Sequence, residues 1–191
     1  MGLTINPAVS GGRRRWLGHS AVFFGGAFFG GLLTLAGLLA VVGLAGHAAP
    51  VRVLSMVAAA AIAWAVLHDV GLPLPLPYRN RQVPEWLREV MPQSVVAAIF
   101  GGMLGIGFLT LFTYSTQLAV FLALPFLGSA AAMLGVVAIF AFGKTLVLAG
   151  VARARSLDEV PVYWNATGVL VLRVATAAVS LTLAWSLLQA G

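Results

Sequence analysis

Residues 100–117, FGGMLGIGFLTLFTYSTQ, decide how the fold of this chain is interpreted. The segment begins as an apolar stretch rich in glycine and ends in TYSTQ, a run of uncharged polar side chains at residues 113–117. A similar segment, FGGAFFGGLLTL, lies 76 positions earlier at residues 24–35. Seven of the twelve aligned positions are identical, which indicates an internal repeat.

The composition places the chain in a membrane. Of 191 residues, 61% are hydrophobic and 8% are charged, whereas a soluble domain carries roughly 25% charged residues. Apolar runs longer than the roughly 20 residues that cross a bilayer recur through the chain. We therefore predict an all-α, polytopic transmembrane bundle with about five spans.

The predicted helices are separated by residues that end helices. They cover residues 17–46, 51–70, 94–124, 129–151 and 166–188. Turns are expected at residues 47–50, and again at Pro125 and Gly128. Residues 71–93 contain five prolines, which favour an extended path followed by a short interfacial helix at EWLREV. The third run is about 45 Å long as a straight helix, so it must tilt, protrude or break.

The repeat organises the domain. A basic tail, residues 1–15, precedes a single transmembrane domain at residues 16–191. Its two repeat units cover about 17–93 and 94–164, with an offset of 76 to 77, and the helix at 166–188 is extra. Because two helices separate equivalent elements, both units have the same orientation across the membrane.

The arginines indicate the orientation. With the N-terminus inside, eight arginines lie in inner segments: Arg13, Arg14, Arg15, Arg79, Arg81, Arg88, Arg153 and Arg155. The outer segments carry Arg52. This bias predicts a multi-pass protein of the inner (plasma) membrane with a cytoplasmic N-terminus. It also accounts for the net charge of +6 without a nucleic-acid partner.

Glycines spaced by four residues form the first candidate site. Gly26 and Gly30 lie on one face of the first predicted helix, and Gly101 and Gly105 lie on one face of the third. Small residues at this spacing allow helix backbones to approach closely in lipid. Tight packing and a thin helix beside a pore or moving contact are both compatible with the pattern.

The second candidate site is polar. It comprises Thr110, Thr113, Tyr114, Ser115, Thr116 and Gln117. Consecutive polar residues spread around all sides of a helix, so a local break or a partly water-filled cavity is expected here. Two interpretations of these polar residues are open. They would contact a solute, or they would form interhelical hydrogen bonds near the outer interface. The first repeat unit has LAGLL at the equivalent place, so this site would be asymmetric.

Apart from Arg52, which is assigned to the outer end of the second span, three charged residues fall inside predicted spans: Asp69, Lys144 and Arg173. Asp69 and Lys144 occupy matching places in the two units and could neutralise each other. Lys144 could instead extend to the headgroups. Arg173 could pair with Asp69 or Glu159, contact a lipid phosphate, or contact a substrate.

Several functions are disfavoured by the residues present. The chain has no cysteine, which excludes disulfides and thiolate-bound metals. Haem ligation by His19 and His68 is conceivable but lacks a supporting attachment motif. No nucleotide-binding loop, metalloprotease motif or nucleophile elbow is present. We expect no metal or cofactor, and no enzymatic activity.

The segment around Ala98, Gly102 and Phe108 to Leu111 resembles the first helix of each half of the CcdA-type cytochrome c biogenesis proteins. Those proteins belong to a wider group that includes LysE-type exporters. The resemblance implies a small transporter-like scaffold. TYSTQ stands where that family has a Pro-Cys pair, so the resemblance does not extend to thiol transfer.

Two functions are compatible with these features. The first is an accessory or structural subunit that binds partner membrane helices through its glycine faces, with another membrane protein or a second copy as the partner. The second is a small-solute transporter, or a component of one, with a cavity near Thr113–Gln117. The chain has few ionisable residues at mid-membrane, which favours the first.

Overall fold

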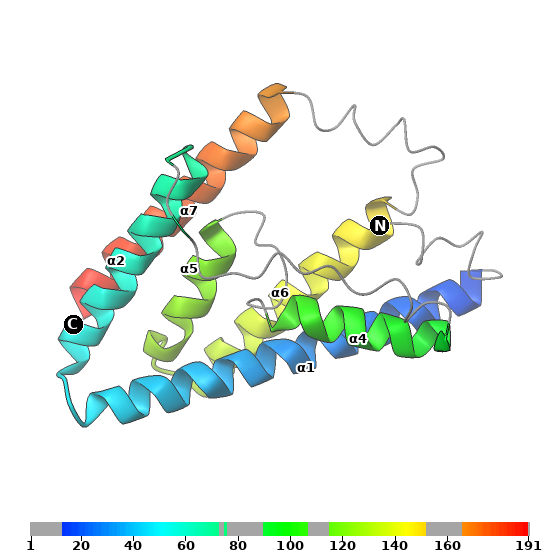
Figure 1. Cartoon of the computed structure of the whole chain (residues 1–191), viewed down its shortest axis with the longest axis horizontal. Coiled ribbons are helices and arrows are strands. Elements are labelled where there is room, and N and C mark those ends of the chain that lie inside the picture. Colours follow the sequence, from blue (N-terminus) through cyan, green and yellow to red (C-terminus); the bar gives the residue numbers. More distant parts are fainter. Residues whose placement is uncertain (1–12, 73–74, 76–89, 107–114, 152–165, 191) are drawn as a thin grey trace.

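The computed structural model describes residues 13–72, 75, 90–106, 115–151 and 166–190. Within these ranges every regular element is helical, which confirms the all-α prediction (Figure 1). The α-helices are α1 (Arg13–Gly46), α2 (Val51–Asp69), α4 (Gln93–Gly105), α5 (Ser115–Ala123), α6 (Ala130–Val151) and α7 (Ala166–Ala190). A short 3₁₀ helix, η2 (Leu124–Phe126), follows α5.

Turns lie where the sequence predicts them. The α1–α2 connection ends at Pro50, whose φ of −58° and ψ of 147° are extended rather than helical. Gly128, with a φ of +70°, supplies the left-handed conformation before α6. The hydroxyl of Ser129 then accepts a hydrogen bond from the backbone N–H of Ala132 at 3.1 Å, which caps α6.

Pro75, in the proline-containing segment, lies beside α2. Gly71 adopts a φ of +111° immediately after α2, a conformation that favours glycine. Beyond it, the indole Nε1 of Trp64 donates a hydrogen bond to the carbonyl of Pro75 at 3.1 Å. This bond attaches the chain at Pro75 to the side of α2. Most of the predicted extended path over residues 71–78, and the interfacial helix at EWLREV except its last residue, fall outside the described residues.

The third apolar run, predicted as one helix over residues 94–124, is two helices. A straight α4 is about 20 Å long and α5 about 14 Å, so each is shorter than the roughly 30 Å hydrocarbon core. The two helices have different neighbours: α4 packs against α1, whereas α5 packs against α2 and α7. The two described helices are therefore not parts of one straight helix, and residues 107–114 between them lie outside the described part.

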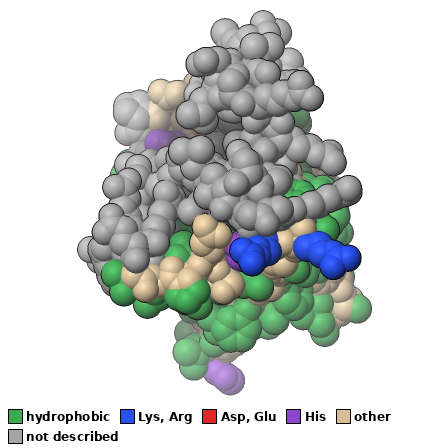
Figure 2. Space-filling model, turned by 90° about the vertical axis from the view of Figure 1, so that its right-hand side faces the viewer, with side chains coloured by type: hydrophobic (Ala, Val, Ile, Leu, Met, Phe, Trp, Pro, Cys, Tyr) green, Lys and Arg blue, Asp and Glu red, His purple; other side chains and the backbone are tan. Residues whose placement is uncertain are grey.

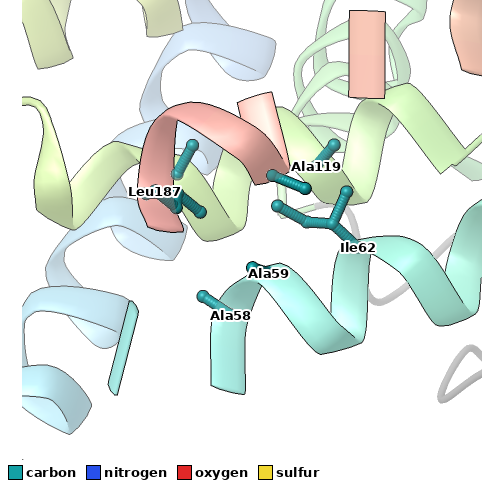
Figure 3. Packing of buried hydrophobic residues seen from close by; sticks show 7 residues of the cluster. Ala58, Ala59, Ile62, Ala119 and Leu187 are labelled. Atoms are coloured by element: carbon teal, nitrogen blue, oxygen red, sulfur yellow. The ribbon is translucent and has the colours of Figure 1, made fainter. Parts of the chain in front are cut away.

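The helices form two groups, α1 with α4 and α6, and α2 with α5 and α7 (Figure 1). The core of the second group is rich in alanine, and its side chains converge from all three helices (Figure 3). The core of the first group joins Phe23 and Ala27 to Ala97 and Ala141.

A third cluster links the two groups where α5 continues into η2. It contains Leu35 of α1, Phe121 and Leu124 of α5 and η2, and Val137 of α6. The ring of Phe121 meets the edge of Phe140, with ring centroids 5.0 Å apart. The end of the third apolar run therefore packs against both helix groups.

Two helices within the described ranges are long and apolar enough to cross a membrane: α1, over Arg14–Gly46, and α2, over Val51–Asp69. The two differ in length. The apolar part of α1, residues 17–46, is about 45 Å long, whereas α2 is about 28 Å long. A bilayer core of about 30 Å accommodates α2 upright but requires α1 to tilt strongly. In Figure 1, α1 and α2 diverge at a steep angle from the turn that joins them.

Candidate functional site

The contact between α1 and α4 is made by four glycines, Gly26, Gly30, Gly101 and Gly105, which we call the glycine seam. A Cβ atom added to Gly26 would collide with the backbone oxygen of Ala98, and one added to Gly30 with that of Gly102. At each of these positions, a hydrogen atom is the largest substituent that fits against the opposite backbone.

The glycine seam is reciprocal. A Cβ at Gly101 would strike the backbone oxygen of Phe23, and a Cβ at Gly105 would strike that of Ala27. Residue numbers increase in the same direction along both helices, so α1 and α4 run parallel. Parallel packing of the first helix of each repeat unit is what the predicted same-direction repeat requires.

Close backbone approach is how helices associate in lipid, where water does not drive apolar surfaces together. Contacts between Cα–H groups and carbonyl oxygens, with dense van der Waals packing, replace that force. In this structure the four glycines are covered by one another's helices inside the chain. In this structure the glycine seam is therefore a contact within the chain.

Thr34 closes the end of the glycine seam. Its side chain is 6% exposed, and its Oγ1 lies 3.2 Å from the Gly30 oxygen, 3.5 Å from the Gly105 oxygen and 3.1 Å from the Ile106 oxygen. The hydroxyl is within reach of the carbonyls of Gly105 and Ile106 at the end of α4, and it can donate its single proton to one of them at a time. Sequence reasoning missed this role, although the repeat aligns Thr34 with Thr110 and so marked a position worth testing.

The predicted polar cavity is not tested by the structure. Thr110, Thr113 and Tyr114 lie outside the described residues. Residues 115–117 form the first turn of α5, but their side chains also lie outside the described part. The site stays a prediction.

The charged residues of the predicted spans lie on three helices. Asp69 is the last residue of α2, Lys144 belongs to α6, and Arg173 belongs to α7, with its side chain outside the described part. The Lys144 ammonium group is half-buried and lies 5.4 Å from the centroid of the Phe140 ring, a distance at which a cation is attracted to the ring face. Across the described ranges, no group of three His, Asp or Glu side chains could hold a metal ion.

An apolar groove lies between α2 and α7, with a volume of about 590 Å³. It is lined by Met56, Ala59, Ala60, Ala63, Leu181, Ala184, Trp185 and Leu188. Half of these residues are alanines. Because their side chains are small, another helix can approach the backbones of α2 and α7 closely. The indole of Trp185 is 63% exposed beside it. The alanine run at residues 58–61 is the sequence signal that could have indicated this groove.

Comparisons with known proteins give one relative. Methylamine utilization protein MauF of Paracoccus denitrificans is 30% identical to this chain over 143 residues, which is 74% of this chain and 50% of the relative. The chain therefore spans about half the length of this curated relative. No family model matches the chain, and no solved structure matches it.

These comparisons overturn the resemblance to CcdA-type and LysE-type proteins, because the similarity found is to a methylamine utilization protein. The physical reason lies in the residues that suggested it. Ala98 and Gly102 are spaced by four because the backbones of α1 and α4 touch there. Any tightly packed helix pair in lipid favours such a pattern, so it does not distinguish families.

Proposed function

We propose that this chain is an accessory subunit of the inner membrane, and that it binds a partner membrane helix in the α2–α7 groove. The observation that carries the proposal is the groove itself, which is alanine-lined and apolar. The glycine seam supports it indirectly, because its glycines already contact each other. The partner-binding function expected from the sequence is thereby kept, while its location moves to another face.

The proposal includes a five-span topology. The spans are α1, α2, the α4–α5 pair, α6 and α7, with the N-terminus in the cytoplasm. The arginine bias supports this orientation. The parallel α1–α4 contact is consistent with it, since two helices separated by one intervening span run in the same direction. Five spans also leave α2 and α7 antiparallel on either side of the groove.

The name of the relative suggests the metabolic process in which this subunit takes part. Its printed name assigns that protein to methylamine utilization, and we extend a role in amine utilization to this chain as part of the proposal. The relative contains about as much sequence again outside the matched region. An accessory segment that works beside further membrane helices agrees with that difference in length.

Photo-crosslinking tests the groove. Because the chain has no cysteine, single cysteines at Ala60 and Ala63 can each carry a benzophenone maleimide in native membranes. We expect both to capture a membrane polypeptide at least about fivefold more efficiently than a cysteine at Ile139. That residue is 74% exposed on α6, which does not line the groove, so it reports the capture expected from exposure alone. The factor corresponds to roughly 1 kcal/mol of preferential association.

The identity of the adduct decides between the possible occupants. A heterologous membrane protein supports the proposal, and an adduct of twice the chain's mass identifies a second copy as the occupant instead. Equal yields at all three positions, or adducts with lipid alone, would show that the groove faces the bilayer without a partner.

One observation favours transport as a second candidate function. The third apolar run is divided into α4 and α5, and each is too short to cross the bilayer. Discontinuous helices of this kind form the substrate sites of many transporters. The name of the relative suggests a small amine as the solute.

Uptake of labelled methylamine into proteoliposomes tests this second candidate. If residues 113–117 contact the solute, Gln117→Ala should lower the initial rate by about tenfold, as expected for losing a hydrogen bond to a charged ligand. Thr182→Ala is the matched control, because its exposed hydroxyl bonds only the carbonyl of Ala178. Uptake equal to that of empty liposomes for the unaltered protein would rule the function out.

A further inference from the structure

Several backbone oxygens converge on one buried hydroxyl where α4 ends. Three carbonyl oxygens lie within 3.5 Å of Oγ1 of Thr34: those of Gly30 at 3.2 Å, Gly105 at 3.5 Å and Ile106 at 3.1 Å. The glycine seam permits this approach, because no Cβ at Gly30 or Gly105 holds the two backbones apart. The hydroxyl and these carbonyls form a group of four oxygen atoms, which we call the oxygen cluster.

The Thr34 hydroxyl has too few protons for the acceptors around it. It carries a single proton, and all three of its distances exceed the value of about 2.7–2.8 Å that is usual for O–H···O bonds. Other hydroxyls that donate to the carbonyl four residues earlier in their own helices do so at 2.8–2.9 Å, namely Thr145, Ser180, Thr182 and Ser186. Thr34 therefore lies between several acceptors, and at least two of the three carbonyls receive no proton from it.

The spacing of the oxygen cluster indicates the size of a cation that fits. Sodium is close in radius to calcium, whose oxygen ligands lie at about 2.4 Å, so ligands at right angles around either ion are about 3.4 Å apart. An ammonium group holds its acceptors at about 2.9 Å in tetrahedral directions, which separates them by about 4.7 Å. The separations of 3.5 Å and 3.1 Å between Thr34 and the α4 carbonyls match sodium and are too short for ammonium.

The depth of the oxygen cluster suits a membrane ion site. Figure 2 faces the end of the molecule where α1 begins, and basic side chains are exposed there, Arg14 and Arg15 among them, a placement that suits the headgroup level. The centre of the apolar stretch 17–46 lies between residues 31 and 32, so Thr34 is within one helical turn of it. The end of α4 at this level carries a partial negative charge. Ends of discontinuous helices near the midplane coordinate ions in transporters.

We infer that Oγ1 of Thr34 and the carbonyl oxygens of Gly105 and Ile106 bind a dehydrated sodium ion. The hydroxyl coordinates the ion through a lone pair and gives its proton to the carbonyl of Gly30, 3.2 Å away. All three ligands are neutral. Neutral carbonyls can replace the hydration shell of a monovalent ion, whereas calcium sites draw on carboxylates. The site belongs to the chain itself and so goes beyond partner binding and amine uptake.

Binding of ²²Na⁺ to the purified full chain in nanodiscs tests the site, with choline as the only other cation. We expect saturable binding to the unaltered chain. Thr34→Val should bind about tenfold more weakly, the loss expected when one polar partner of a charged ligand is removed. Thr34→Ser keeps the oxygen and should bind like the unaltered chain. Thr182→Val is the matched control, because it removes an exposed hydroxyl that bonds its own helix, and it should change nothing.

Competition by unlabelled cations on the unaltered chain completes the test and remains informative if Thr34→Val misfolds. Sodium should displace the label at a concentration at least about tenfold lower than potassium or methylammonium. A helical chain, as judged by circular dichroism, that shows no saturable binding would overturn the site, as would equal binding by folded Thr34→Val. Displacement by methylammonium at a lower concentration than sodium would overturn the choice of ion. Neither measurement involves a partner or uptake, so failure here is distinct from failure of the proposed function.

Discussion

Alanine at Gly26 is expected to destabilise the bundle by about 2 kcal/mol, although alanine is the better helix former by about 1 kcal/mol. The added methyl group would occupy the position of the Ala98 backbone oxygen. Backbone cannot rotate away as a side chain can, so α1 and α4 must separate along the whole glycine seam. Gly30→Ala and Gly105→Ala meet backbone in the same way and should have similar effects.

The neighbouring glycine provides the control. A Cβ at Gly25 meets nothing within 4 Å, so Gly25→Ala should be neutral or slightly stabilising through helix propensity alone. Unfolding by SDS in mixed micelles, followed by far-UV circular dichroism, compares the two variants in one assay. Equal effects at Gly25 and Gly26 would mean that α1 and α4 do not touch through this face.

Replacing Thr34 with valine should have the second largest effect on stability, about 1.5 kcal/mol. Valine has nearly the same shape, so the change removes the hydroxyl and little else. The carbonyls of Gly105 and Ile106 would lose the nearby donor at the buried end of α4. An unpartnered buried acceptor costs about 1–3 kcal/mol, although hydrogen bonds between membrane helices average near the lower end.

The same unfolding assay measures this effect with two comparisons. Thr34→Ser keeps a hydroxyl and should recover most of the lost stability. Thr182→Val removes an exposed hydroxyl that bonds only its own helix and should cost little. If Thr34→Val behaves like Thr182→Val, then the hydroxyl does not hold the end of α4.

Most helix ends were predictable because they depend on local chemistry. Pro50 stops a helix through its own backbone, and Gly128 provides a conformation that other residues avoid. The predicted ranges 51–70 and 129–151 accordingly differ from α2 and α6 by one residue at one end. The apolar periodicity that normally assigns faces was uninformative, because these helices are apolar on all sides.

The third run shows where local rules fail. No proline lies between residues 94 and 124, so nothing local fixed a break. In the described part of the run, α4 and α5 pack against different helix groups, which is a tertiary difference. The length of the run and its polar end had indicated that a break was possible, but only the partner helices determine where it falls.

The candidate sites show the same limit of local sequence patterns. Glycine spacing identified residues able to touch another backbone, but spacing does not name the neighbour, so the sequence favoured an external partner. Thr34 was invisible because a threonine in an apolar helix usually bonds its own backbone.

The α1–α4 contact also has a consequence for biosynthesis. Thr34 meets acceptors 71 and 72 residues later in the chain, and α2 is made and inserted in between. At a translation rate of about 5–20 residues per second, roughly 4–15 s pass between the synthesis of α1 and the synthesis of α4. During that interval its glycine face is open to lipid or to an insertion factor. Until α4 is made and covers this face, two nascent copies of the chain can pair wrongly through it.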